Sequence, residues 1–282
     1  GGLGWFPKLV SEIGVARVGF ESDHMTVAGH SAFTKAVEDA KSGGATTLVS
    51  TAGVVEKLRA LKDEAELDLM ARAVQIADAA IDRIGPTIER GVTEQAVAWE
   101  LEKAMRDGGA EAIAFDIIVA AGPNAAHPHH RAGDKRVQSG EAVVIDMGAT
   151  YLGYCSDLTR TIIVGEPDDT LRRVFDTVLR AQLAAEERVA SGMTGGEADA
   201  IGREIIAEAG YGDDFGHSLG HGIGLAVHEY PRVGPGSEDP LENGMVFSIE
   251  PGIYVPGWGG VRIEDLVVLE NGRARVLTKA RK

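Results

Sequence analysis

The chain has few of the features that mark secreted, membrane or nucleic-acid-binding proteins. Its one cysteine, Cys155, excludes an internal disulfide. Every apolar run is shorter than the roughly 18 residues of a membrane-spanning helix, and we find no basic-then-apolar signal segment. The formal net charge is −15, from 28 basic and 43 acidic residues. We therefore expect an acidic cytoplasmic protein that binds neither nucleic acid nor an anionic membrane.

The length of 282 residues suits one large domain with a small appendage, and 44% hydrophobic residues are ample for a core. Residues 1–57 contain strand-like runs at 16–20 and 46–50, and helical spacing from Thr26 to about Ala40. These are too few for a complete domain, so we expect a small α/β piece followed by the main domain, 58–282. Because the chain opens without an initiator Met, we expect a processed or truncated form.

The main domain repeats one plan. An apolar stripe with helical spacing runs through 67–84 and another through 171–189. Each is followed by a Gly-x-Thr sequence and a second helix, and Thr194 with Glu197 has capping-box spacing. The predicted strands are 115–120, 142–147 and 158–164 in the first half, and 222–229, 244–249 and 261–269 in the second. We predict two halves, each a helix pair followed by a hairpin, related by a pseudo-twofold axis.

Four carboxylates occupy matching places in these halves. Asp146 and Glu250 each follow a glycine by six residues, at the end of an apolar run, while Asp157 and Glu264 lie on the next strand-like run. Each aspartate alone is also typical of a turn or a helix cap. Four buried acids are too costly to leave uncompensated, so we expect a pair of divalent cations among them.

Histidines gather close to these acids in the sequence. His217, His221 and His228 fall within twelve residues, and glycines around His221 allow close approach of the backbone. This pattern favours one metal ligand and two further site histidines, and it differs from the His-Glu-x-x-His of helical zinc sites. The Pro-His129-His130 sequence is equally compatible with a polar surface turn.

Four carboxylates and one imidazole form an oxygen-rich set that suits Mn²⁺, Co²⁺ or Zn²⁺. Two such ions, about 3.5–4 Å apart, activate a shared water and stabilise a tetrahedral intermediate, which is hydrolytic chemistry. Arg262 lies two residues before Glu264 and so on the same strand face. It could orient a carboxylate, bind substrate or form a surface ion pair.

Together these motifs resemble those of the metal-dependent Xaa-Pro peptidases, the prolidases and aminopeptidase P. They lie between about residues 58 and 280 and read Val-Ile-Asp-Met-Gly, Ser-Asp-Leu-Thr-Arg-Thr, Gly-His-Gly-Ile-Gly with a later His-Glu, Ser-Ile-Glu-Pro-Gly-Ile-Tyr and Gly-Val-Arg-Ile-Glu-Asp. The resemblance implies an α+β pita-bread fold around a curved antiparallel sheet. It also implies a cytoplasmic, homodimeric metallopeptidase that cleaves the Xaa-Pro bond of dipeptides or peptide N-termini with a hydroxide bridging two ions, manganese first among the candidates.

The resemblance also implies residue roles. The metal ligands would be Asp146, Asp157, His221, Glu250 and Glu264, with Asp157 and Glu264 bridging the ions. His129 and His228 fall where the family has histidines that contact the substrate carbonyl or the tetrahedral intermediate, and Arg262 falls on the family's arginine before the last ligand.

Two further assignments concern the flanks of this site. Tyr254 and Trp258, in the glycine-rich stretch between the last two acids, are candidates to border the proline ring or simply to pack the hairpin. Residues 1–57 resemble the tail of the family's N-terminal creatinase-like domain, and 58–282 its pita-bread catalytic domain.

Other interpretations share the fold. Methionine aminopeptidases have the same ligands, but the 258–262 stretch and the Pro-His129 pair favour the prolidase branch. Creatinase-like hydrolases lack the metal set, and a non-catalytic pita-bread binding protein would not need it intact. A broader dipeptidase stays open, as does the choice between dipeptidase and aminopeptidase, which depends on loops at the substrate's C-terminal side.

Overall fold

The computed structural model describes residues 3–39 and 46–282, in two compact units, Gly1–Leu58 and Arg59–Lys282. The first unit contains η1 (Leu3–Trp5), α1 (Phe6–Ile13), α2 (Val27–Asp39), the start of α3 (Val54–Ala60) and the parallel strands β1 (Arg17–Glu21) and β2 (Thr47–Thr51). The two predicted strands are confirmed. The predicted helix is confirmed as far as Asp39, and its last residue, Ala40, lies outside the described residues. The assignment of 1–57 to a creatinase-like domain stays a prediction.

Two helix pairs frame the second unit. They are α4 (Glu64–Ile84) with α5 (Glu94–Asp107) and α6 (Asp169–Arg188) with α7 (Gly195–Glu208). Each helix begins after an Asp or Thr whose side chain accepts a hydrogen bond from a backbone N–H three residues on. The capping box of Thr194 and Glu197 is confirmed. The predicted apolar stripes form the buried faces of α4 and α6.

The strands of the second unit pair antiparallel in four sheets. The first half contains β3 (Ala112–Ile113), β4 (Ile118–Ala121), β5 (Glu141–Met147), β6 (Ala149–Tyr151), β7 (Tyr154–Cys155) and β8 (Leu158–Val164). The second half contains β9 (Gly220–Gly222), β10 (Glu229–Val233), β11 (Val246–Ile249), β12 (Gly252–Val255), β13 (Gly259–Arg262), β14 (Asp265–Glu270) and β15 (Arg273–Val276). Short 3-10 turns are η2 (Gly85–Thr87), η3 (Gly122–Ala126) and η4 (Gly212–Asp214).

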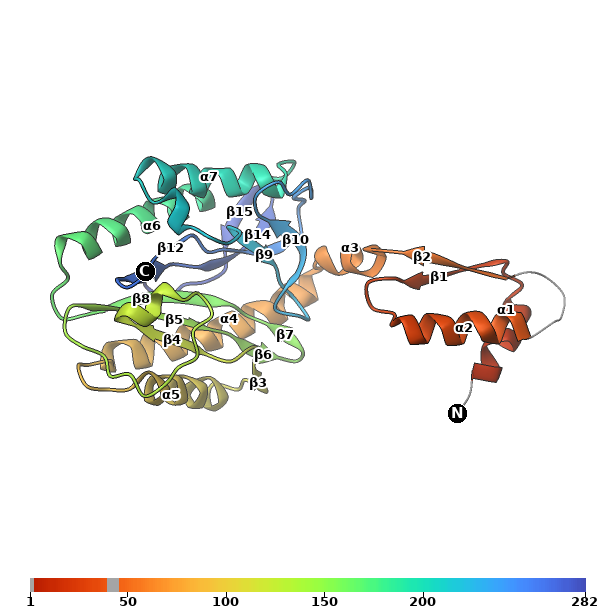
Figure 1. Ribbon diagram of the computed structural model, residues 1–282, viewed down its shortest axis with the longest axis horizontal. Coiled ribbons are helices and arrows are strands. Elements are labelled where there is room, and N and C mark those ends of the chain that lie inside the picture. Colours follow the sequence, from red (N-terminus) through yellow and green to blue (C-terminus); the bar gives the residue numbers. More distant parts are fainter. Residues whose placement is uncertain (1–2, 40–45) are drawn as a thin grey trace. The chain divides into compact units, whose positions relative to one another are not determined.

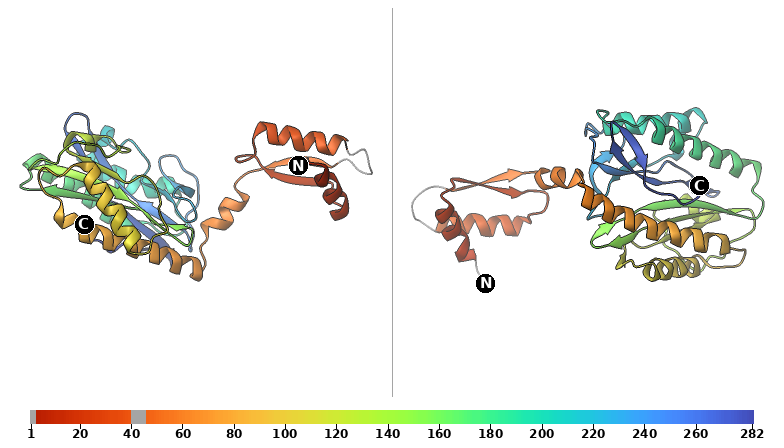
Figure 2. Two further views of the ribbon diagram at one scale, coloured as in Figure 1. Left: turned by 90° about the horizontal axis from the view of Figure 1, so that it is seen from below. Right: turned by 180° about the vertical axis from the view of Figure 1, so that it is seen from behind.

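The helix pairs lie on opposite sides of these strands. Figure 1 shows α6 and α7 above the strands and α5 below them, while α4 crosses behind the strands of the first half and lies in front of them in the view from behind in Figure 2. The principal pairs, β5 with β8 and β11 with β14, occupy matching positions in the two halves. The predicted duplication of a helix pair and strands is therefore present.

Three predicted strands need correction, because the chain passes between sheets within two of them and turns between neighbouring strands of one sheet within the third. The run 115–120 becomes a strand only at Ile118, since the chain first leaves the β3-β6-β7 sheet. The run 222–229 is mostly turns between β9 and β10, where a Cβ on Gly222 would lie 2.2 Å from the Tyr230 carbonyl oxygen. The run 261–269 breaks at Ile263 and Glu264, between the β12–β13 hairpin and the five-stranded sheet.

None of the helices in the described ranges has both the length and the apolar character needed to cross a bilayer.

Candidate metal centre

The five side chains predicted as metal ligands come from neighbouring strand ends. Asp146 lies on β5, and Asp157 immediately precedes β8, the partner of β5. His221 is the middle residue of β9, Glu250 directly follows β11, and Glu264 lies between β13 and β14. Segments more than 100 residues apart in the chain therefore contribute to one group.

The distances within this group are short. His221 Nε2 lies 3.3 Å from Glu250 Oε1 and 3.7 Å from Asp157 Oδ2. Asp157, His221 and Glu264 each offer one ligand atom, and these atoms lie within 4.8 Å of one another. Protein ligands contact a divalent ion at about 2.0–2.6 Å, so one ion can reach several members of this group at once.

Two unpaired oxygens support a cation in this group. Asp146 Oδ1 and Glu264 Oε1 are buried and have no hydrogen-bond partner. Their carboxylates are held by the other oxygen, since Arg262 Nη2 donates to Asp146 Oδ2 at 2.6 Å and Thr159 Oγ1 donates to Glu264 Oε2 at 2.7 Å. Buried polar atoms without partners are rare and need an explanation, and divalent cations supply one.

His221 is oriented as metal-binding histidines usually are. Its Nδ1 lies 3.1 Å from the carbonyl oxygen of Gly222, which places a proton on Nδ1 and directs Nε2 toward the carboxylates. Its backbone N–H donates to Ser248 Oγ, and that hydroxyl donates to Glu250 Oε1 at 3.0 Å. The residues present therefore fit a set of divalent metal ligands.

Without metal, the pKa values within this group are strongly shifted. Burial and then the charges of Glu264 and Asp146 raise the pKa of Asp157 well above its usual range. Burial and then the charges of Glu250 and Asp146 do the same to the pKa of Glu264. The metal-free site therefore holds protons on carboxyl groups that bound cations would displace.

His221 and Glu250 form an ion pair in the metal-free protein. Burial alone would lower the pKa of His221, but its hydrogen bond with Glu250 and the charge of that carboxylate raise it to about 9. Burial alone would raise the pKa of Glu250, but the same contact lowers it to about 2. A metal ion at Nε2 must replace the proton that this pair holds.

A cavity of about 600 Å³ opens in front of the ligand group. Asp146, Asp157, His221 and Glu250 line it together with His129, His228 and Arg262. The His228 ring lies 4.2 Å from the His221 ring, centroid to centroid, and burial, then the charge of His221, lower the pKa of His228.

Two arginines that we did not predict also line this cavity. Arg131 follows His129 and His130, and Arg232 follows Pro231 at the end of the histidine-rich segment. Both side chains are exposed. Their adjacency to predicted site segments was the only sequence signal for them.

Tyr254 and Trp258 are not among the residues that line this cavity in the described part of the chain. The Tyr254 hydroxyl lies 2.8 Å from His217 Nε2 and accepts a hydrogen bond from Arg262 Nη1 at 2.9 Å. Trp258 borders a separate hollow of about 110 Å³ beside Pro123. A direct contact of either side chain with substrate stays a prediction.

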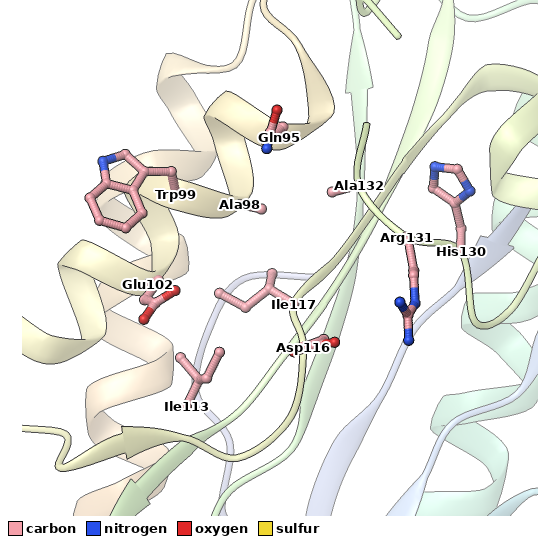
Figure 3. A pocket seen from close by; sticks show the side chains of 10 residues that line it. All are labelled: Gln95, Ala98, Trp99, Glu102, Ile113, Asp116, Ile117, His130, Arg131 and Ala132. Atoms are coloured by element: carbon pink, nitrogen blue, oxygen red, sulfur yellow. The ribbon is translucent and has the colours of Figure 1, made fainter. Parts of the chain in front are cut away.

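A smaller hollow of about 280 Å³ adjoins the main cavity, and Asp116, His130 and Arg131 line both. Figure 3 shows its opposite wall, where Trp99 and Glu102 project from α5. The Trp99 side chain is largely exposed. The two hollows therefore meet along the loop that carries His129.

Glu94, the first residue of α5, holds this loop. Its carboxylate is fully buried and accepts hydrogen bonds from Ala121 N at 2.8 Å, Asn124 Nδ2 at 2.9 Å and Gly133 N at 3.2 Å. His130 Nε2 lies 2.9 Å from its second oxygen. Sequence reasoning missed Glu94, since a Glu after a Thr cap is also typical of an ordinary helix start.

Known proteins are similar to this chain in sequence and fold. Metallopeptidase family M24 matches residues 68–271. A Xaa-Pro dipeptidase of Pyrococcus furiosus is 49% identical over 226 residues, which cover 80% of this chain and 65% of that protein. This chain thus spans just under two thirds of that relative.

Solved structures are similar over nearly the whole chain. A Xaa-Pro dipeptidase from Bacillus anthracis superposes with a TM-score of 0.93 at 46% identity, covering 99% of this chain and 77% of that one. An X-Pro aminopeptidase from Thermotoga maritima gives 0.90 at 39%, covering 98% and 76%. The expected α+β pita-bread fold is confirmed, and the chain belongs to metallopeptidase family M24.

Proposed function

We propose that this chain hydrolyses the peptide bond before proline, in dipeptides or at peptide N-termini, with two divalent ions, Mn²⁺ first among them. The observation that carries the metal part is the pair of buried carboxylate oxygens without partners, on Asp146 and Glu264, beside His221 Nε2. The names of the Xaa-Pro dipeptidase relatives support the substrate class. The cytoplasmic location and the homodimer stay predictions of the family resemblance.

Asp146, Asp157, His221, Glu250 and Glu264 would hold the ions, with Asp157 and Glu264 shared between them. The ions would supply Lewis acidity toward the scissile carbonyl and lower the pKa of water. Arg262 keeps one oxygen of Asp146 engaged, so that the other faces the group.

The other cavity residues act on the substrate. His228 and His129 line the cavity beside the ligand group and would donate hydrogen bonds to the carbonyl oxygen as negative charge develops. Proline's nitrogen has no N–H, so the cavity needs no acceptor there, and Phe115, Ile118 and Val227 supply apolar wall for a ring. Arg131 and Arg232 are cations suited to a substrate carboxylate.

The decisive measurement compares kcat/KM for Ala-Pro, Ala-Ala and Met-Ala on one preparation of Mn²⁺-loaded protein. We expect Ala-Pro to exceed both others by at least about tenfold, a discrimination that one pocket contact can supply. We also expect chelation to abolish turnover. An Asp157→Asn control should lose metal and activity together.

Other results of this comparison would contradict the proposed substrate or the proposed metal mechanism. A preference for Met-Ala would place the chain with the methionine aminopeptidases, and a preference for Ala-Ala would indicate a broader dipeptidase. Turnover that survives complete metal removal would refute the metal mechanism. Adding Ala-Pro-Ala to the panel distinguishes dipeptidase from aminopeptidase specificity, because only the latter accepts a residue after proline.

A further inference from the structure

Glu264 occupies a break in the strand pattern. β13 ends at Arg262 and β14 begins at Asp265, so strand pairing does not hold the backbone of Glu264. Its N–H donates to the Thr159 carbonyl at 3.1 Å, and its carbonyl accepts a hydrogen bond from Arg160 Nη1 at 2.6 Å. The position of this carboxylate therefore depends on residues of β8.

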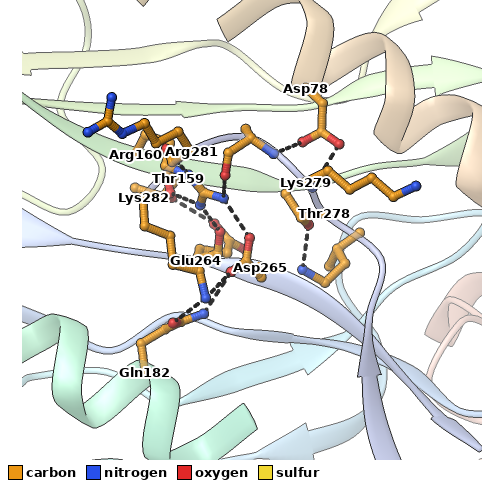
Figure 4. Close-up of polar contacts among 12 residues, drawn as sticks. Asp78, Thr159, Arg160, Gln182, Glu264, Asp265, Thr278, Lys279, Arg281 and Lys282 are labelled. Atoms are coloured by element: carbon orange, nitrogen blue, oxygen red, sulfur yellow. Dashed lines mark hydrogen bonds and ion pairs between the residues drawn. The ribbon is translucent and has the colours of Figure 1, made fainter. Parts of the chain in front are cut away.

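Arg160 uses all five of its N–H donors, and the side chain is almost fully buried. Nη1 donates to the carbonyls of Thr159 and Glu264, while Nη2 donates to Asp265 Oδ1 and the Ala280 carbonyl, both at 2.7 Å. Nε donates to the Arg281 carbonyl at 3.0 Å. Figure 4 shows the guanidinium between the Glu264–Asp265 backbone and the C-terminal segment. Because every N–H of this planar guanidinium is bonded, the Arg160 side chain is fixed in one orientation.

The C-terminal segment, residues 278–282, is itself fixed at both ends. Asp78 of α4 accepts hydrogen bonds from Lys279 N at 2.9 Å and Ala280 N at 3.0 Å. At the other end, Lys282 Nζ lies 2.8 Å from Asp265 Oδ2 and 2.7 Å from Gln182 Oε1. Contacts therefore run from α4 through the segment to Arg160, and from there to the backbone of Glu264 (Figure 4).

We propose that Arg160 is a positioning residue for Glu264, and that the C-terminal segment holds Arg160 in the orientation this role requires. The inference rests on the proposed function in one respect, the role of Glu264 as a metal ligand. Partners beyond the first ligands orient them and commonly affect metal affinity by about 10- to 100-fold. Metal affinity therefore becomes sensitive to contacts made by a segment outside the cavity.

Two substitutions distinguish a role in positioning Glu264 from a contribution to folding stability alone. Arg160→Lys keeps the positive charge beside Asp265 but loses the fork that holds the carbonyls. Asp78→Asn leaves Arg160 and Glu264 unchanged and removes one acceptor for the segment, because an amide NH₂ cannot accept. Asp82→Asn is the matched control, one turn along α4 on its exposed face.

The experiment titrates chelator-stripped proteins of residues 1–282 with Co²⁺ and follows visible absorption, with circular dichroism as the check of folding. We expect Arg160→Lys to weaken binding of at least one ion by about 10- to 100-fold and to alter the spectrum. Asp78→Asn should shift affinity in the same direction by a smaller factor, and Asp82→Asn should match the wild type. If Arg160→Lys does not fold, Asp78→Asn decides.

Wild-type Co²⁺ affinity and spectrum in both variants would overturn the positioning role. This holds even if both variants melt at a lower temperature, because the network would then contribute to stability alone. Failure of the wild type to bind Co²⁺ is a different result, which would refute the proposed metal function and this inference with it. Wild-type binding without peptidase activity would refute the proposed substrate and leave the positioning role intact.

Discussion

At the scale of single residues, bound protons reduce the repulsion between the buried carboxylates of the metal-free site. His221 and Glu250 share one in an ion pair, and Asp157 and Glu264 have raised pKa values because their charges are buried beside other carboxylates. A divalent cation at this group would displace these protons. The free energy of unfolding in the absence of metal should therefore depend on pH.

The folded-state pKa of His221 is about 9, against 6.5 for an ordinary histidine, so the folded chain binds more protons than the unfolded chain between these values. Its stabilising contribution is therefore complete below about pH 6.5 and lost by about pH 9. The raised pKa values of Asp157 and Glu264 act in the same direction. Glu250 has a pKa of about 2, so it stays charged and its contribution to stability is constant between about pH 6.5 and 9.

We therefore expect the melting temperature of chelator-treated protein to fall as pH rises from about 6.5 to about 9. The Mn²⁺-loaded protein should show a flatter profile, because the bound ion replaces the proton at Nε2. His221→Gln should reduce the slope of the metal-free profile. A metal-free melting temperature that stays constant or rises over this range would contradict the ion pair.

At the scale of elements, the start of α5 determines the shape of one cavity wall. Glu94 bonds to residues on both sides of the loop that carries His129, including Asn124 and His130. A glutamine there presents one acceptor oxygen and an NH₂ that faces the N–H of Gly133, so one of the present bonds is lost. The loop should then position His129 less accurately.

We expect Glu94→Gln to lower kcat on Ala-Pro by up to about 100-fold, the effect of a displacement of about 1 Å in a catalytic group. Metal content should not change, because no predicted ligand lies on this loop. Glu100→Gln, on the exposed face of the same helix, serves as the control. Loss of metal in Glu94→Gln, or unchanged kcat, would disprove the proposed link to His129.

At the scale of the whole molecule, the two compact units differ in how much core they bury. In the described part of the first unit, Phe6 and Val10 are the buried hydrophobic side chains, whereas the second unit contains several large buried clusters. Segments with little buried apolar area open first. The cavity and the predicted ligand group lie wholly within the second unit.

Limited proteolysis followed by mass spectrometry should therefore cut the first unit early and leave a resistant fragment beginning near residue 59. That fragment should still bind Co²⁺, because all five predicted ligands belong to it. Equally fast cleavage within 59–282, or a resistant fragment that binds no metal, would contradict the independence of the second unit.

The sequence alone determined the features that follow from local chemistry. Helical spacing identified α4 and α6, and Thr194 with Glu197 identified a helix start. The order of acids and glycines showed the duplication. These signals are readable because periodicity and capping depend on residues a few positions apart.

Tertiary structure decided what depends on residues far apart in the chain. No local rule predicts that the run 261–269 breaks at Glu264, since the break arises where the chain passes from one sheet to another. Tyr254, a candidate either to border the proline ring or to pack the hairpin, has its hydroxyl bonded to Arg262 and His217. Arg160 meets Asp265 across 105 positions. Such contacts exist only after two distant segments have packed, so residue types and spacing indicated the chemistry, while packing determined which groups orient it.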